Sequence, residues 1–227
     1  MSDSSPTAAR IASAASVLFG ISFFLTVASV NVPHRASDAE LLEWWSQDAN
    51  VTSGMVSMMF AICTAVLFAV VTNHVVLAAG DRSRHWAAFA RSMATAFTAI
   101  LLVSGMLRGV IGHLTKVEDG PLPGIDVLRF SRSLNYTLIS VVLMTVFALT
   151  VISLGVLVIR TASLARWQAY VGIGCGALTL VAVAAMVGSF TVPLAVLWSL
   201  CTAVAIWRSP MASPAGPARE PVGTMAA

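Results

Sequence analysis

The sequence predicts an all-α integral membrane protein: a bundle of six transmembrane helices with a short amphipathic helix in its first outer loop. The composition is too apolar for a water-soluble domain, since 58% of the 227 residues are hydrophobic and only 10% are charged. A soluble domain carries about 25% charged residues, which keep its surface in solution. The mean hydropathy of +0.87 agrees. Six apolar segments approach the length of about 20 residues that crosses a bilayer as a helix.

The six predicted spans occupy most of the chain. The apolar run of the first is about 20 residues, longer than the 7–15 residues typical of a signal peptide, so we expect an uncleaved helix. The fifth and sixth spans are joined by Gly188-Ser189-Phe190-Thr191 and should form a tight hairpin, with Pro193 in the first turn of the last helix. The spans are Ile11–Val32, Val51–Val71, Ala87–Leu107, Tyr136–Val158, Ala169–Ser189 and Val192–Trp207.

Two tails flank the transmembrane domain, which we assign to residues 10–208. Residues 1–9 are mostly small and polar, and residues 209–227 contain several prolines among Ala, Gly and Ser. Such a composition cannot bury a hydrophobic core. We therefore predict that both tails are disordered.

The basic residues of the loops orient the predicted bundle. Cytoplasmic loops of membrane proteins carry an excess of Arg and Lys. Placing both termini in the cytoplasm puts eight of the 13 basic residues inside, and the acids of the two long loops outside. Trp86, Trp167 and Trp207 then mark inner helix ends, as an interfacial aromatic belt does. The inner basic residues are Arg10, Arg82, Arg84, Arg91, Arg160, Arg166, Arg208 and Arg219, and the outer acids are Asp38, Glu40, Glu43, Asp48, Glu118, Asp119 and Asp126.

The first outer loop contains a helix signal of its own. Ser37-Asp38-Ala39-Glu40 has the S-x-x-E form of a capping box, in which the serine and glutamate side chains satisfy the first backbone N–H groups. Leu41, Trp44 and Trp45 then fall on one helical face. We favour an interfacial helix that rests on lipid headgroups. The alternative is a lid over the outer face of the bundle.

The connection Arg160-Thr161-Ala162-Ser163-Leu164-Ala165-Arg166-Trp167 and the loop start Ser37-Asp38-Ala39-Glu40 resemble a family of actinobacterial multi-pass membrane proteins of unknown function. The resemblance covers the chain from Arg10 to Trp207. It implies a six-helix bundle in a bacterial inner membrane. It implies no activity, substrate or site residue.

The predicted spans contain neither Asp nor Glu. Proton and cation relays place carboxylates inside a bundle, because such groups must gain and lose charge there. Membrane enzymes that hold magnesium and a diphosphate also need carboxylate oxygen ligands. The composition of the spans therefore argues against both classes.

The outer face carries the best candidate site. Arg108 lies about 17 residues, roughly 25 Å, beyond Arg91 on the third span, which places it near the outer membrane boundary. Gly105, Gly109 and Gly112 around it should let a neighbouring helix approach closely. We predict an outward vestibule for an anionic or amphipathic ligand such as a lipid headgroup. Its candidate residues are Arg108, His113, Arg129, Arg132, Asn135 and Tyr136.

A structural role for Arg108 is the alternative. Its side chain could extend to the headgroups or pair with an acid of the outer loops, and so only fasten the bundle. We favour this fastening role over the ligand site.

Metal or haem binding is a further alternative. Met55, Met58 and Met59 fall in the outer half of the second span, near His113, and thioether and imidazole groups suit copper. Methionine is more often a filler of apolar cores. Haem would need paired histidines on facing helices, whereas His34 and His85 lie in loops. We predict no metal and no cofactor.

Small residues predict close helix packing. Gly172 and Gly176 form a G-x-x-x-G pattern at the start of the fifth span. We favour packing within the chain, and a homo-oligomer through these glycines stays open. Cys63, Cys175 and Cys201 lie far apart in the sequence and form no C-x-x-C motif, so we predict that they are small apolar packing residues.

Function follows from these features only as ranked hypotheses. We favour a non-enzymatic protein that binds or moves a small amphipathic or anionic molecule, or supports membrane partners. The alternative is a membrane-embedded enzyme or a copper or haem redox protein acting at the outer face. Membrane lipids are the expected partners. Nucleic acid is not expected, because the net charge is only +3 and no basic run occurs.

Overall fold

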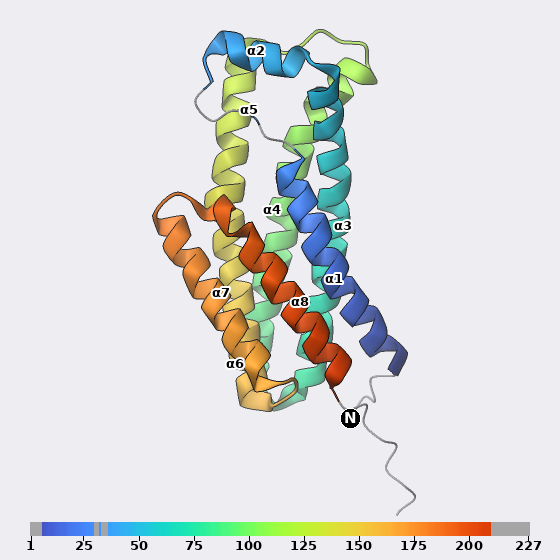
Figure 1. Cartoon of the computed structure of the whole chain (residues 1–227), viewed down its shortest axis with the longest axis vertical. Coiled ribbons are helices and arrows are strands. Elements are labelled where there is room, and N and C mark those ends of the chain that lie inside the picture. The colour runs from blue at the N-terminus through green and yellow to red at the C-terminus, as the bar shows by residue number, and fades with distance from the viewer. Residues whose placement is uncertain (1–5, 30–31, 33–35, 210–227) are drawn as a thin grey trace, which may run out of the picture.

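The fold is a bundle of helices that crosses the membrane six times (Figure 1). The computed structural model describes residues 6–29, 32 and 36–209, and within these residues every regular element is a helix. The predicted all-α membrane bundle is thereby confirmed. The spans are α1 (Pro6–Ala28), α3 (Asp48–Ala79), α4 (Arg84–Lys116), the continuous α5 (Ile125–Thr137), η2 (Leu138–Leu143) and α6 (Met144–Thr161), α7 (Arg166–Ala184), and η3 (Gly188–Thr191) with α8 (Val192–Arg208).

The first and last helices run antiparallel and side by side. Ser13 and Ser16 of α1 donate hydrogen bonds to the carbonyl oxygens of Ala203 and Ser199 on α8, at 3.0 and 2.8 Å. The start of α1 and the end of α8 therefore lie at one end of the bundle, which we call the terminal end. We call the opposite end, which carries α2 (Asp38–Ser46), the distal end.

The six spans fall into two length classes. With 23, 19 and 21 residues, α1, α7 and η3–α8 match the roughly 20 residues that cross a bilayer. The others have 32, 33 and 37 residues, and α3, α4 and α5 continue past the ends of α1, α7 and α8 (Figure 1). A dozen extra residues add about 18 Å of helix. We call this projection the distal segment.

The predicted span limits differ most from the structure in the long helices. Val51–Val71, Ala87–Leu107 and Tyr136–Val158 each cover only the apolar part of a longer helix. The extra turns of α4 and α5 at the distal end are mixed in polarity, because they pack on neighbouring helices rather than face lipid. By contrast, the fifth span was predicted to extend too far, because α7 ends at Ala184 rather than at Ser189. Residues 6–9, predicted as tail, form the start of α1, and of the predicted C-terminal tail only Ser209 lies among the described residues.

An aromatic cluster fills the middle of the bundle. Its side chains are at most 1% exposed, and the centroids of Phe68 and Phe97 are 4.3 Å apart. Offset and edge-on ring contacts of this kind add to packing energy. The cluster ties α1, α3, α4, α6 and α8 together. Its members are Phe19, Phe23, Phe68, Phe97, Phe147 and Trp198.

Glycines bring α3 and α4 into close contact. A Cβ added at Gly105 would lie 2.7 Å from the Cβ of Ala61, and one at Gly109 would lie 2.6 Å from the sulfur of Met58. The glycines around Arg108 thus permit the close approach that the sequence predicted. Gly172 and Gly176 of α7 likewise pack within the chain, against α8 and α6. A homo-oligomer through this pair stays a prediction.

The helix α2 begins at the predicted capping box and packs on the distal segment. The Ser37 hydroxyl accepts the Glu40 N–H, and the Glu40 carboxylate accepts the Ser37 N–H at 2.7 Å. Leu41 and Trp45 are buried, in a small core separate from the aromatic cluster. Its buried members are Leu41, Trp45, Val51, Ile111 and Leu128. The apolar face of α2 is therefore covered by protein, which corrects our interpretation that it rests on headgroups.

Replacing Gly105 by Ala should destabilise the protein. The new methyl group would meet the rigid Cβ of Ala61, and overpacking of this kind costs about 1–3 kcal/mol. That exceeds the roughly 0.5–1 kcal/mol that Ala gains over Gly in a helix. Gly174→Ala is the matched control, because a Cβ there meets nothing within 4 Å. Unfolding free energies in mixed detergent micelles measure the difference, and equal stability of the two variants would contradict the packing.

The Glu40 carboxyl should titrate below its ordinary pKa of 4.5, because the Ser37 N–H and then the Ser37 hydroxyl donate to its charged form. Since the folded-state pKa is lowered, the cap is intact above the ordinary pKa and is lost as the pH falls through the folded value. A carbon-13 NMR titration of Glu40 measures this. Ser37→Ala should move the midpoint upward, and a midpoint unchanged by that substitution would rule out the hydroxyl contribution.

Candidate functional site

Arg108 lies buried on α4, at the level where α1 ends. The residue is only 7% exposed. Its Nη1 donates to the Thr26 carbonyl oxygen at 2.5 Å and to the Ser57 hydroxyl at 3.0 Å. The Nε atom is buried without a hydrogen-bond partner. Within the described part of the chain, no carboxylate forms an ion pair with this guanidinium.

The position of Thr26 at the end of α1 explains why its carbonyl oxygen accepts a hydrogen bond from Arg108. Thr26 is two residues from the last residue of α1, where helix carbonyls lack intrahelical donors. A cation there completes the hydrogen bonding and complements the negative end of the helix dipole. The Ser57 hydroxyl also donates to the Thr26 carbonyl, at 2.8 Å. Arg108 therefore fastens α1 to α3 and α4 through Nη1 alone.

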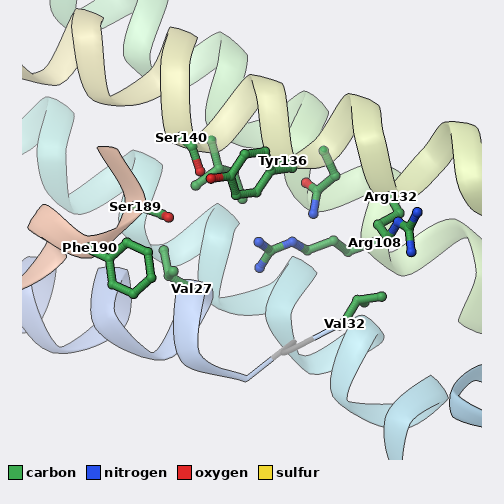
Figure 2. Close-up of a pocket in the computed structure, with 10 residues that line it drawn as sticks. Val27, Val32, Arg108, Arg132, Tyr136, Ser140, Ser189 and Phe190 are labelled. Atoms are coloured by element: carbon green, nitrogen blue, oxygen red, sulfur yellow. The ribbon is translucent and has the colours of Figure 1, made fainter. Parts of the chain in front are cut away.

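A cavity of about 220 Å³ lies on the other side of the guanidinium. Figure 2 shows the Arg108 side chain reaching into it, between Tyr136 and Ser140 on one side and Val27 on the other. Residues from α1, α4, α5, η2 and η3 meet here, and none of them is acidic. The lining residues are Val27, Val32, Arg108, Arg132, Asn135, Tyr136, Ile139, Ser140, Ser189 and Phe190.

Several polar groups of the lining have hydrogen-bonding capacity to spare. The Asn135 oxygen accepts the Ser104 hydroxyl at 2.5 Å, and its amide nitrogen donates to no described residue. The Ser140 hydroxyl is buried without a partner. The Nη2 of Arg108 makes no hydrogen bond with the described residues either, since Nη1 makes both. The cavity thus presents donors, one of them charged.

The wall that holds Ser140 is a π-helical turn. The turn η2 joins α5 to α6 without a break, and π turns within α-helices are frequent at functional sites. Gly188 of η3 presses against it, because an added Cβ would lie 2.0 Å from the Ser140 carbonyl oxygen. Tyr136 donates to the Met186 carbonyl oxygen at 2.9 Å. These contacts fix the connection between α7 and α8 against the cavity.

Four of the six predicted site residues line the cavity: Arg108, Arg132, Asn135 and Tyr136. The Nη1 of Arg132 also donates to the Ala36 carbonyl oxygen, at 3.3 Å, just before α2.

The other two predicted site residues lie elsewhere. His113 is 3.2 Å from the Glu118 carboxylate, and Arg129 pairs with Asp38 and, at 3.5 Å, with Asp126. Both are exposed at the distal end, where nearby acids attract them.

Sequence reasoning missed Ser140, Ser189 and Phe190. Ser140 comes four residues after Tyr136 on the same helix, and residues at this spacing lie on one helix face. The spacing could therefore have identified Ser140 as a neighbour of the predicted site. Ser189 and Phe190 belong to the hairpin that the sequence predicted, but nothing in it indicated contact with Arg108.

The methionines considered for copper do not converge. Met58 and Met55 pack against Gly109 and Gly112, whereas Met59 is exposed on the outside of the bundle. Among the described residues, His, Cys, Asp and Glu form no group of three or more that could hold a metal ion. His34 lies outside the described residues.

Comparisons with family models, with curated proteins and with solved structures give no match to this chain. The expected relation to a family of actinobacterial membrane proteins therefore stays a prediction. The site rests on the geometry of the chain's own residues.

Replacing Ser57 by Ala should weaken the fastening of α1. The substitution removes one of two acceptors of Arg108 Nη1, and hydrogen bonds to charged groups inside a membrane protein contribute about 1–2 kcal/mol. Ser53→Ala is the control on the same helix, because that hydroxyl donates only to the carbonyl oxygen of Asn50. Unfolding free energies of the two variants decide the matter, and an equal loss in both would contradict this role of Ser57.

Proposed function

We propose that this protein binds an anionic amphiphile in the cavity beside Arg108, and that the distal end faces the outside of a bacterial cell membrane. One observation carries the proposal: a guanidinium only 7% exposed lines a cavity without an acidic partner among the described residues. Burying an uncompensated ion costs several kcal/mol. An anion in the cavity would offset that cost, whereas the Thr26 carbonyl and the Ser57 hydroxyl supply only partial charges.

The lining supports an amphipathic ligand rather than a simple ion. Val27, Val32, Ile139 and Phe190 form an apolar part of the wall, while the arginines, Asn135 and Ser140 form a polar part. Small-molecule sites combine such a wall with a few convergent polar groups that fix the orientation of the ligand.

The helix lengths support a location at the membrane boundary. The three short spans are about 29–35 Å long, close to the 30 Å thickness of a bilayer's hydrocarbon core. Their distal ends, Ala28 of α1 and the turn η3, therefore fall near one membrane surface. The cavity touches both ends, through Val27 and Phe190, and this contact supports a position at headgroup depth.

The charge distribution supports the orientation. In the described part of the chain, Arg84, Arg160, Arg166 and Arg208 gather at the terminal end, as expected for a cytoplasmic face. Seven of the eight described acids lie on α2, at the start of α3 and α5, and after α4, at the distal end, and Asp81 of η1 (Gly80–Ser83) is the exception at the terminal end.

The aromatic cluster favours binding over transport. The rings fill the bundle between the cavity and the terminal end, and each side chain is at most 1% exposed. A ligand that enters from the distal end therefore meets a closed wall. A receptor, carrier subunit or lipid-dependent anchor fits this arrangement better than a channel.

Dodecyl phosphate should bind the purified protein saturably in dodecyl maltoside, whereas dodecyl maltoside itself lacks the charge that Arg108 would attract. Arg108→Gln should weaken binding at least tenfold, or about 1.4 kcal/mol. Isothermal titration calorimetry measures both. Arg132→Gln is a second variant, needed if the first fails to fold. Arg91→Gln, exposed on the same helix and away from the cavity, should bind as the wild type does.

Two results would overturn the proposal. One is the absence of saturable binding to the folded wild-type protein. The other is unchanged affinity in both cavity variants when circular dichroism and gel filtration show that they are folded.

A further inference from the structure

We infer that the anionic group in the cavity is the phosphate of a membrane lipid, which enters sideways from the bilayer while its acyl chains remain outside. This inference rests on the proposed function and names the ligand class of the same site.

The arrangement of donors fits a phosphate. Arg108 approaches from α4, Asn135 from α5 and Ser140 from η2, so hydrogen-bond donors surround the cavity on more than one side. A planar carboxylate offers two oxygens, which one guanidinium can occupy in a bidentate pair. The phosphodiester of a lipid offers two charged oxygens and two weakly accepting ester oxygens in a tetrahedral arrangement, so its acceptors do not share one plane. Such a group can use the charged donor and the neutral donors together.

Ser140 is the most informative of these donors. Its hydroxyl is fully buried and has no partner in the protein. Further along the same continuous helix, the hydroxyls of Thr145 and Thr150 donate to the carbonyl oxygens four residues earlier, at 2.6 and 2.8 Å. A buried hydroxyl without a partner costs about 1–3 kcal/mol. A phosphate oxygen in the cavity would remove that cost.

The cavity is large enough for a headgroup but not for a whole lipid. Its volume of about 220 Å³ is below the roughly 300–1,000 Å³ of sites that enclose drug-sized ligands. Phe190 lines it and is also 76% exposed, and Met186 and Val187 beside it are exposed too. This apolar turn connects the cavity with the hydrocarbon region. Acyl chains can therefore lie against the turn while the phosphate contacts Arg108.

The charge of the distal end favours the route through the membrane. Its described residues include seven acids, Asp38, Glu40, Glu43, Asp48, Glu118, Asp119 and Asp126, but only four bases, Arg108, Lys116, Arg129 and Arg132. Lys116 and Arg129 are also paired with acids. A free anion approaching from water meets a net negative surface, which slows its encounter. A lipid that diffuses in the plane of the membrane reaches the cavity from its apolar side.

Native mass spectrometry of the full chain in detergent tests the inference. The protein is mixed with equimolar dioleoyl phosphatidylglycerol and oleic acid, which share the oleoyl chain but differ in the anionic group. We expect one retained phosphatidylglycerol per chain, displaced neither by oleate nor by an excess of inorganic phosphate.

Ser140→Ala supplies the decisive variant. The substitution removes no hydrogen bond within the protein, so thermal stability without lipid should not fall. Affinity for phosphatidylglycerol should fall about tenfold, as expected for a hydrogen bond to a charged group. Ser133→Ala is the matched control, because Ser133 is exposed on α5 and does not line the cavity. Equal affinity of Ser140→Ala and Ser133→Ala would overturn the assignment of Ser140 as a phosphate ligand.

The remaining outcomes separate this inference from the proposed function. If oleate displaces phosphatidylglycerol at equal concentration, anionic amphiphiles bind but phosphate is not preferred, and the inference fails alone. If inorganic phosphate displaces the lipid, the ligand comes from water and the lateral route is wrong. If neither lipid is retained, the proposed function fails together with the inference.

Discussion

The burial of the Arg108 guanidinium is the constraint on which the rest of the distal half depends. The group is held where α1 ends, and its Nη1 serves the Thr26 carbonyl and the Ser57 hydroxyl. These two acceptors leave the charge itself uncompensated, while Nη2 and Nε make no hydrogen bond to described residues. From sequence, fastening and ligand binding were competing interpretations of Arg108. In the structure, Nη1 makes both fastening contacts and leaves Nη2 without a described partner, so the two interpretations are compatible.

The spans of this fold were predictable because lipid imposes a simple rule: an apolar stretch of sufficient length becomes a helix. The same rule does not reach beyond the bilayer. Ile111 and Leu128 lie in the distal segment, where burial comes from neighbouring helices and from α2. Their surroundings in the sequence are mixed in polarity, so hydropathy placed the end of α4 too early and the start of α5 too late. The position of α2 was missed for a related reason, since an amphipathic pattern does not say whether lipid or protein covers the apolar face.

The candidate site was predictable in part. Arg132, Asn135 and Tyr136 lie on one face of α5 by their spacing, and Arg108 reaches the same level from α4. His113 and Arg129 carry the same kinds of groups but have acids close by, at Glu118 and Asp38. Sequence shows the types of charges but not these pairings. Ser140 resembles any hydroxyl residue of a transmembrane helix, and only the coordinates show that it has no partner.

The cavity follows from the difference in helix length. Where α1 stops and η3 turns back, the helices α3, α4 and α5–α6 continue, so backbone ends lie beside unbroken helices. The last carbonyl groups at such ends lack intrahelical partners and need donors from elsewhere. Arg108 and Tyr136 supply them, to Thr26 and to Met186. The polar side chains that serve these helix ends therefore gather at one depth, and they form part of the wall of the cavity left between them. In a bundle of six equally long helices, the unsatisfied helix ends would all lie at the two faces of the bundle, and no end would lie beside an unbroken helix that carries a donor such as Arg108.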